Sequence, residues 1–376
     1  MNIYNNITHF KGLNTLRFFA AYLVLMHHSE TMKAKNGLPN LENINLFHNG
    51  SNAVTFFFVL SGFLITYILL KERKATQTIS IKRFYLKRVL RIWPLYFLLV
   101  LLGTIIIPFL INLFSINYTM PYTFGEVWYY FLFFFPGLVL FYHGNHLLEA
   151  LWSIGVEEIF YLVWAPLFKF VKKNILTLLY SVIIAKSILL AIPYFILMPS
   201  VYTYIVGILQ FEAMAIGGLG AYYIFNTQKK FSFFKIYNRY FQLFFYSLLA
   251  VFLIFNTNIN LPIWDVIFKT PIISTLFIDF LFLYLIIGVA LGSNKFVKKE
   301  NKILSYLGEI SYGIYMYHMI IVSFVILVLK SIHLPIHNVF FQIIYYVIVT
   351  LGTLLVSHLS KKYFEDKFLQ LKKTLK

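Results

Sequence analysis

Two polar side chains of types that take part in chemistry, Arg17 and His28, lie inside the first apolar segment of the chain, Gly12–Ser29. A charged side chain at bilayer depth costs about 2.5–3.5 kcal/mol on insertion scales, so such a residue usually marks a site. On one helix the pair would span roughly 16 Å, about half of the hydrocarbon thickness. Histidine changes its charge near neutral pH, so His28 is suited to be a general base that activates a hydroxyl group.

Simpler explanations exist for each of these residues. Arg17 lies near the start of the segment and could extend its side chain to the interface. His27 and His28 could both be residues of the outer interface. Neighbouring positions on a helix point about 100° apart, so only one of the two histidines can easily face an active site. Their occurrence together on one helix favours a function.

Two arginines, Arg88 and Arg91, lie at the start of the apolar segment Ile92–Phe114. A basic cluster on the cytoplasmic side of a membrane helix is by itself a sufficient explanation. Residues three apart share a helix face, however, and guanidinium groups suit phosphate geometrically. The functional alternative is a clamp for a phosphate-bearing cofactor that enters from the cytoplasm.

Two adjacent acids, Glu157 and Glu158, follow Ser153 within the apolar segment Leu151–Phe168. Adjacent residues on a helix point to different faces, so we expect the two acids to have different roles. One of them could simply pair with Arg17 for membrane insertion.

A third constellation, Ser311, Tyr315 and His318, has the spacing of one helical stripe. The structural alternative is a polar stripe that holds helices together. The outer loop Ser115–Ala150 lacks Lys and Arg but contains His143, Asn145, His146 and Glu149. The spacing of the scattered histidines does not indicate a metal site, and we expect none. Three further ionisable residues lie in apolar segments with an open role: Lys186, Glu212 and Asp279.

The composition places all of these residues in a membrane protein. Of 376 residues, 60% are hydrophobic and only 12% are charged, with no cysteine, whereas soluble domains have about 25% charged residues. The absence of cysteine excludes disulfides, thiolate catalysis and cysteine-ligated metals. The first segment keeps Arg17 and lacks a cleavage site, so we interpret it as a retained helix and not as a signal peptide.

The lengths of the apolar segments predict an all-α, polytopic bundle with about ten spans. The expected spans are Gly12–Ser29, Ala53–Leu70, Ile92–Phe114, Leu151–Phe168, Ile175–Leu197, Tyr202–Phe225, Tyr240–Phe255, Ile272–Leu291, Leu304–Leu329 and Val339–Leu359. We expect one transmembrane domain, residues 1–376 with the core 12–359, and no appended soluble domain.

The net charge of +18 reflects topology and not nucleic-acid binding. With a cytoplasmic N-terminus and ten spans, 26 of the 32 Lys and Arg fall inside and 4 outside, as the positive-inside rule requires. An eleventh apolar segment, Val127–Tyr142, would place 17 downstream cations outside if it crossed. We therefore expect it to lie along the outer interface or to re-enter, and both termini to be cytoplasmic. Anionic lipid is the partner that the basic side would meet.

The chain resembles the integral-membrane acyltransferase-3 family from Gly12 to about Leu359. The resemblance rests on five motifs in the family's order: Arg17 with His28 as Arg-x10-His, Phe56–Ile65, Arg88-x-x-Arg91, Trp152–Tyr161 and Leu307–His318. By spacing, the family's histidine is His28 and not His27. The chain departs from the pattern at Gly155, where Ser is usual, and at Gln210, where relatives often carry Arg. Gly155 weakens any assignment of a catalytic hydroxyl at that position.

The resemblance implies transfer of an acyl group, commonly acetyl, from acyl-coenzyme A to a hydroxyl of an extracytoplasmic glycan or lipid-linked saccharide. In this reading His28 is the general base or a transient acyl carrier, and Glu157 or Glu158 orients it. Arg17 positions an anionic part of the donor or an acid. The remaining expected roles are coenzyme A binding by Arg88 and Arg91, and substrate or supporting contacts by Ser153, Ser311, Tyr315 and His318. The expected location is a bacterial inner membrane.

Two other classes remain open from the residues alone. A proton-coupled transporter or glycolipid flippase could use His28, Glu157 and His318 as a proton relay. A non-catalytic membrane scaffold would tolerate single substitutions in these motifs.

Overall fold

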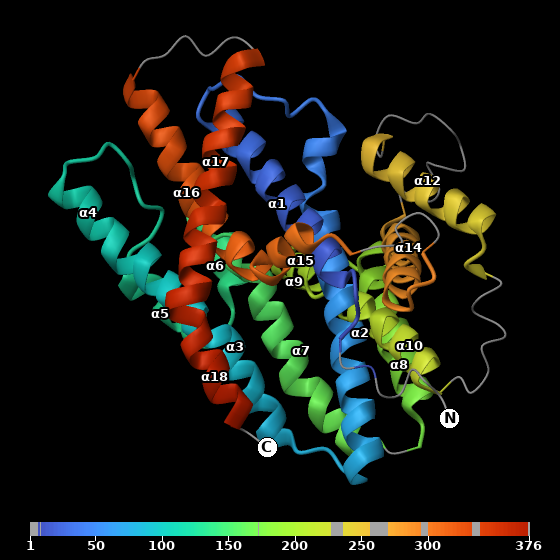
Figure 1. The fold of residues 1–376 in the computed structure, drawn as a ribbon. Coiled ribbons are helices and arrows are strands. Elements are labelled where there is room, and N and C mark those ends of the chain that lie inside the picture. The colour runs from blue at the N-terminus through green and yellow to red at the C-terminus, as the bar shows by residue number, and fades with distance from the viewer. Residues whose placement is uncertain are drawn as a thin grey trace. The chain divides into compact units, whose positions relative to one another are not determined.

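A computed structural model describes residues 7, 9–171, 173–226, 236–255, 270–294, 300–332 and 339–374, and no strand occurs among them. The first helices are α1 (Leu13–Lys35), α2 (Gly50–Thr76), α3 (Ile81–Leu101), α4 (Ile107–Leu113), α5 (Phe124–Leu132), α6 (Pro136–His143), α7 (Leu151–Phe170) and α8 (Ile175–Ala191). They are followed by α9 (Ser200–Ile208), α10 (Phe211–Asn226), α12 (Arg239–Phe255), α14 (Pro271–Ala290), α15 (Lys302–Glu309), α16 (Ser311–Ile332), α17 (Val339–Ser360) and α18 (Asp366–Thr374) (Figure 1).

Eight helical stretches among the described residues are long and apolar enough to cross a membrane. They correspond to eight of the ten predicted spans, which confirms a polytopic helical membrane protein. The two others are α1, which carries ionisable residues along its length, and α12, which has 17 residues. The crossing of α1 and α12 stays a prediction. One of the four cations predicted outside, Lys269, and two of the scattered histidines, His333 and His337, lie outside the described residues.

The helix contacts group into two compact units. Unit 1 comprises Met1–Leu23, Asn43–Ile79 and Val163–Glu309, and unit 2 comprises Val24–Glu42, Ser80–Leu162 and Ile310–Lys376. The boundaries fall inside α1 and α7, so each of these helices contributes one part to each unit.

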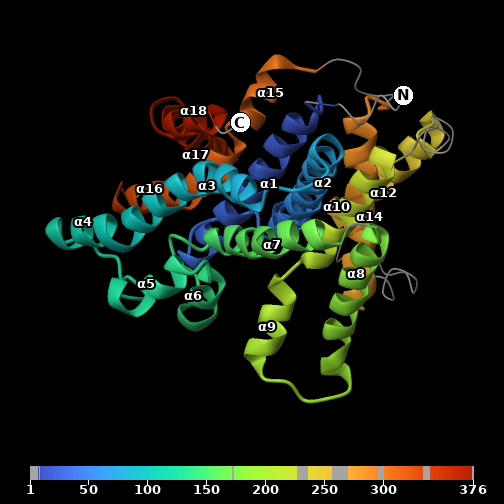
Figure 2. The same cartoon turned by 90° about the horizontal axis from the view of Figure 1, so that it is seen from below.

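Unit 1 is built around the close approach of α2 and α10. A Cβ atom on Gly62 would lie 1.9 Å from the carbonyl oxygen of Met214, and one on Gly217 would lie 2.0 Å from that of Val59. Small residues let helix backbones approach closely where lipid provides no hydrophobic drive for association. Helices α8 and α14 pack against α10 from other sides, and Figure 2 shows α8 and α9 as neighbouring helices joined by one loop.

Unit 2 contains α3, the short helices α5 and α6, the first part of α7, and the pair α16 and α17, which lie side by side (Figure 1). Helix α3 continues into a π-helical turn, Leu102–Ile106. The predicted segment Val127–Tyr142 forms α5 and α6, of 9 and 8 residues. Neither helix is long enough to cross a bilayer, which needs about 20 residues. Their position at the outer interface stays a prediction.

The predicted span Leu304–Leu329 is divided in the structure. Helix α15 ends at Glu309 and α16 begins at Ser311. Gly308 lets α15 approach the backbone of α1 closely, because a Cβ at this position would lie 1.9 Å from the carbonyl oxygen of Asn14. The last predicted span is longer than expected, since α17 continues through a π-helical turn, Lys361–Glu365, into α18.

A buried ion pair fixes the end of α1 within unit 2. Lys33 and Glu30 are 0% and 1% exposed, and the Lys33 Nζ atom lies 2.7 Å from Glu30 Oε1. Lys33 also donates to Gln342, and the hydroxyl of Tyr346 donates to Glu30; both partners belong to α17. The predicted span ends at Ser29 and so puts Lys33 among the four outer cations, whereas α1 extends to Lys35 and Lys33 is buried.

Candidate active site

The imidazole of His28 lies between a carboxylate and a second imidazole, all within unit 2. Its Nε2 atom lies 3.4 Å from Glu149 Oε1, and its Nδ1 atom lies 3.0 Å from His318 Nε2. His28 comes from α1, Glu149 from the loop before α7, and His318 from α16. The side chains of His28 and Glu149 are each 12% exposed, and His318 is fully buried. The site is therefore sheltered, with limited access at Glu149.

The hydrogen-bond partners assign the proton positions in the neutral rings. The Nδ1 atom of His318 lies 2.6 Å from the carbonyl oxygen of Tyr315, which can only accept, so Nδ1 carries the proton and Nε2 a lone pair. The Nδ1 atom of His28 faces that lone pair and, at 3.1 Å, the carbonyl oxygen of Val24. Nδ1 of His28 is therefore a donor, which leaves its Nε2 with the lone pair that a base needs.

The carboxylate of Glu149 is held ionised by its surroundings. Burial alone would raise the pKa of Glu149. The hydrogen bond and positive charge of a protonated His28, together with a hydrogen bond from Asn145, outweigh burial and lower the pKa to about 2. A lone pair and a carboxylate 3.4 Å apart attract only when a proton lies between them. A hydroxyl group that donates a hydrogen bond, or a proton on His28 Nε2, would stabilise both the imidazole and the carboxylate. A general base takes up such a proton during the reaction.

The loop that carries Glu149 is fixed by His146. The backbone N–H of Leu148 and the hydroxyl of Tyr122 both donate to His146 Nδ1, at 3.1 and 3.0 Å. Burial is the main cause that lowers the pKa of His146, to about 4, so the ring is neutral at neutral pH. Leu148 in turn packs on Gly103 in the π-helical turn, where a Cβ would lie 2.6 Å from its side chain. These contacts set the position of Glu149.

The stripe Ser311, Tyr315 and His318 begins α16, as its spacing predicts, and its three residues are buried. Tyr315 connects α16 to α7, since its hydroxyl lies 2.7 Å from Ser153 Oγ and donates to the carbonyl oxygen of Ala150 at 3.0 Å. Two of the expected supporting residues, Ser153 and Tyr315, therefore meet in the structure, and Tyr315 also accepts from His318 through its carbonyl.

The adjacent acids Glu157 and Glu158 bind different partners, as their helical positions suggest. Glu157 accepts from the hydroxyl of Tyr161 at 2.8 Å, and Glu158 accepts from Trp93 Nε1 at 2.9 Å. The carboxylate that pairs with His28 belongs instead to Glu149. The acidic loop without Lys or Arg was the sequence signal for Glu149, but its distance from His28 along the chain concealed the contact.

A steric reason accounts for Gly155 in place of the family's usual serine. A Cβ at this position would lie 2.5 Å from the carbonyl oxygen of Phe134 and 2.8 Å from the ring of Pro136. The turn between α5 and α6 occupies the space that a side chain would need.

The two arginines of the predicted phosphate clamp, Arg88 and Arg91, belong to α3. The guanidinium carbon of Arg88 lies 5.6 Å from the ring centre of Phe84 and 5.8 Å from that of Tyr161. Its Nε atom is buried without a hydrogen-bond partner among the described residues, and Glu157 and Glu158 act on it electrostatically. Arg91, one turn further, is exposed. An unpartnered guanidinium N–H beside an exposed arginine fits an anionic group such as phosphate.

Arg17 and His27 belong to the same helix as His28, α1. Arg17 belongs to unit 1, where its Nη1 atom donates to Asn14 Oδ1 at 3.4 Å. His27 places its ring against that of His28, with centroids 5.2 Å apart. Within the described residues, no group of three or more His, Cys, Asp or Glu could hold a metal ion.

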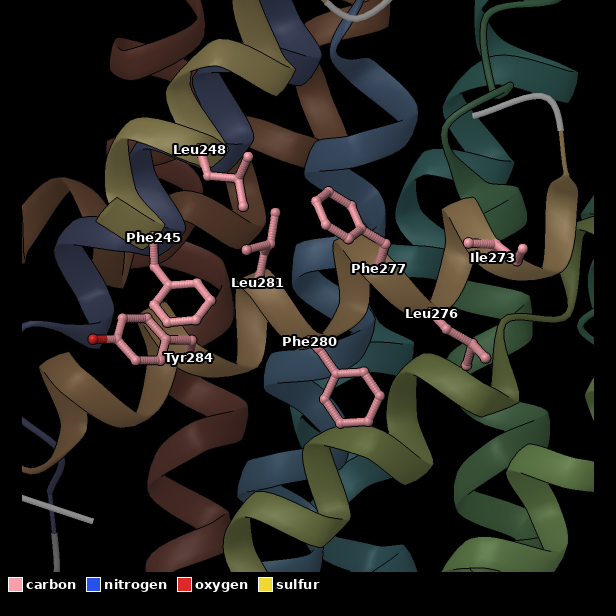
Figure 3. Close-up of a pocket in the computed structure, with 8 residues that line it drawn as sticks. All are labelled: Phe245, Leu248, Ile273, Leu276, Phe277, Phe280, Leu281 and Tyr284. Atoms are coloured by element: carbon pink, nitrogen blue, oxygen red, sulfur yellow. The ribbon is translucent and has the colours of Figure 1, made fainter. Parts of the chain in front are cut away.

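An apolar groove in unit 1 has no comparable chemistry. It lies between α12 and α14, with a volume of about 490 Å³. Figure 3 shows Phe245 of α12 against Tyr284 of α14, and Leu248 of α12 near Leu281 of α14. The phenol of Tyr284 is the polar group in its lining, and its hydroxyl already donates to the carbonyl oxygen of Ile236 at 2.8 Å.

The fold and the site together define a multi-pass helical membrane protein with a sheltered histidine–carboxylate pair. The sequence profile of the acyltransferase domain family matches residues 10–359. The chain therefore belongs to the acyltransferase-3 family, as its motifs indicate.

Named relatives agree with this membership. The peptidoglycan O-acetyltransferase OatA of Listeria monocytogenes is 28% identical over 41% of this chain and 23% of its own length. A Bacillus subtilis protein, YrhL, named as a proposed peptidoglycan O-acetyltransferase, is 29% identical over 42% of this chain and 23% of its own. A Staphylococcus aureus (strain COL) protein, named as a proposed O-acetyltransferase, is 25% identical over 97% of this chain and 58% of its own. The chain thus spans no more than 58% of these relatives. No solved structure matches it.

Proposed function

We propose that this protein transfers an acyl group, commonly acetyl, from acyl-coenzyme A to a hydroxyl of an extracytoplasmic or cell-surface glycan. The observation that carries the proposal is the contact of His28 Nε2 with the sheltered carboxylate of Glu149 at 3.4 Å, backed by the hydrogen bond between His28 Nδ1 and His318 Nε2. The family membership and the relatives named as O-acetyltransferases support the acetyl group and the glycan acceptor.

In the proposed reaction, His28 Nε2 takes the proton of the acceptor hydroxyl while the oxygen attacks the thioester carbonyl. The new C–O bond forms, the C–S bond breaks, and the leaving thiolate recovers the proton from His28 as free coenzyme A. Glu149 stabilises the imidazolium that exists between these steps. His28 could alternatively carry the acyl group on the same nitrogen before it reaches the acceptor.

The donor in this proposal reaches the site from the cytoplasm. Arg88 and Arg91 bind phosphate groups of coenzyme A, because guanidinium groups form paired hydrogen bonds with phosphoryl oxygens. Arg17 positions an anionic part of the donor or an acid. The acceptor, free or lipid-linked, approaches from the outer side, and the protein resides in a bacterial cell membrane.

The decisive experiment measures acyl-coenzyme A consumption and acyl transfer by the purified full chain in proteoliposomes. His28→Ala should abolish transfer while the protein still inserts, and His27→Ala, its matched control, should have a milder effect. Mass spectrometry of cell-surface glycans with and without the protein then identifies the acceptor. Wild-type protein that consumes no acyl-coenzyme A but moves protons or glycolipid would support the transporter class instead.

A further inference from the structure

Three ionisable side chains meet inside unit 1, outside the proposed reaction. Lys186 on α8, Glu212 on α10 and Asp279 on α14 are 5%, 2% and 0% exposed. Each belongs to a helical stretch that is long and apolar enough to cross a membrane. Ionisable residues at this depth are expensive and usually mark a pathway or a binding site for an ion.

The contacts satisfy the lysine but not both acids. The Lys186 Nζ atom lies 3.4 Å from Glu212 Oε2 and donates to the carbonyl oxygen of Val206 at 2.5 Å. Asp279 is close enough for both side chains to act on it electrostatically. Neither carboxyl oxygen of Asp279 has a hydrogen-bond partner among the described residues, although the side chain is fully buried.

The charges of the three groups do not balance. One ammonium and two carboxylates leave a net charge of −1, and an uncompensated buried charge is strongly destabilising. The other helices packed on α14 are α2 and α12, and the groups that act on Asp279 are Glu212 and Lys186. The cluster needs one more positive charge.

The geometry favours a proton over a metal ion as that charge. Hard metal cations in proteins take about six or more oxygen ligands. The cluster offers two carboxyl groups, and the neighbouring carbonyl of Val206 already accepts from Lys186. A proton needs only one carboxyl oxygen.

We propose that Lys186, Glu212 and Asp279 form a proton-binding site, in which Asp279 holds one exchangeable proton beside the charged Lys186–Glu212 pair. Loss of this proton leaves the net charge uncompensated where α8, α10 and α14 pack together. The stability of unit 1 therefore depends on proton uptake at a site separate from His28.

Two measurements on the purified full-length protein in detergent test the proposal. Infrared difference spectroscopy should show the band of a protonated carboxylic acid in the wild type, and Asp279→Asn should lack it. Thermal unfolding is also followed over pH, in sodium or in a bulky organic cation. The Tm of the wild type should fall as the pH is raised, and Asp279→Asn should show a smaller fall. Lys186→Met leaves two acids without a cation, so its Tm should fall more steeply with pH than that of the wild type.

Glu212→Gln provides an independent test, also if Asp279→Asn does not fold. Lys186 and Asp279 then balance each other without an extra proton, so the protonated-acid band should disappear here too. A band as strong as that of the wild type in either variant would overturn the proposal. A rise in the wild-type Tm that requires sodium, and is lost in either variant, would overturn it in favour of a metal-cation site.

Discussion

At the residue scale, the site depends on one carboxylate that a loop supplies to a helix. Glu149 is ionised at neutral pH because its pKa is lowered to about 2 against the effect of burial. In the proposed reaction, its negative charge stabilises the imidazolium of His28 that forms during transfer. A residue with this role affects turnover more than substrate binding.

Glu149→Gln keeps the shape of the side chain and removes its charge. We expect kcat to fall on the order of 10²-fold with little change in KM, because general acid–base catalysis contributes about 10²–10⁴-fold. Steady-state acyl transfer, normalised to inserted protein, is the measurement. Glu157→Gln and Glu158→Gln are the matched controls and should cost less; a larger loss in either of them would return the orienting role to the adjacent acids.

Neutral His146 links the loop to pH. Its pKa is lowered from 6.5 to about 4, mainly by burial, so between these values the unfolded chain binds a proton that the folded protein does not. Stability should therefore fall as the pH drops from 6.5 to 4, by at most about 3 kcal/mol. Thermal unfolding of His146→Gln should lack this part of the pH dependence. Tyr122→Phe, which removes one hydrogen bond but keeps the imidazole, should retain it.

The arginines of α3 have distinct surroundings and should differ on substitution. Arg88→Ala and Arg91→Ala should raise KM for acyl-coenzyme A, and Lys at either position should restore binding only in part, because an ammonium group lacks the bidentate fork. Titration of coenzyme A against purified protein measures this directly. Equal affinity in the wild type and the double Ala variant would leave these residues with a topological role alone.

The sequence located His28 because its spacing from Arg17 lies within one helix, where distance follows from residue count. Glu149 could not be located in this way. Its contact with His28 depends on the loop geometry set by His146 and Leu148, which no local pattern encodes. The same distinction applies to Glu157 and Glu158. Helix periodicity predicts that their side chains diverge, but their partners, Tyr161 and Trp93, depend on packing.

At the element scale, apolar length predicted ten spans, because about 20 apolar residues suffice to span the bilayer. Eight of them coincide with helical stretches of the described residues that are long and apolar enough to cross. The divided span at Ile310 and the continuation of α17 into α18 were not predicted. Apolar residues continue through the break, and its position reflects the contact of Gly308 with Asn14. The tail after Leu359 is polar enough to resemble a loop, yet it forms a helix that packs on α3.

Close backbone contact between α2 and α10 predicts a steep response to one methyl group. Gly62→Ala would place a Cβ 1.9 Å from a carbonyl oxygen of α10, so the helices must separate, at a cost of about 1–3 kcal/mol or more. Gly125→Ala on α5 meets nothing within 4 Å and should be neutral or slightly stabilising. Thermal unfolding of the two variants in detergent compares them; equal Tm values would refute the close packing.

At the scale of the whole molecule, the charge distribution predicts cytoplasmic positions for the ends of two loops. The chain lacks cysteine, so single cysteines at Asn226 and Asn301, both exposed, report topology without a background. An impermeant thiol reagent should label both only after the inner face is opened. Labelling of both in intact cells would refute the ten-span arrangement and the outer position of Val127–Tyr142.

Helix α1 has two attachments in unit 2, and both hold the helix that carries His28 and not the loop that carries Glu149. His28 is hydrogen-bonded to α16, and Lys33 and Glu30 are hydrogen-bonded to α17. The helix that carries the base is therefore held by neighbouring helices at two positions along its length. The carboxylate of Glu149, in contrast, belongs to a short connection between α6 and α7. The imidazole pair and the carboxylate are therefore anchored through different contacts: helix α16 holds the first, and His146 with Leu148 holds the second. In the proposed reaction, a substitution in the connection would change the acid beside the base and leave the pair of imidazoles in place.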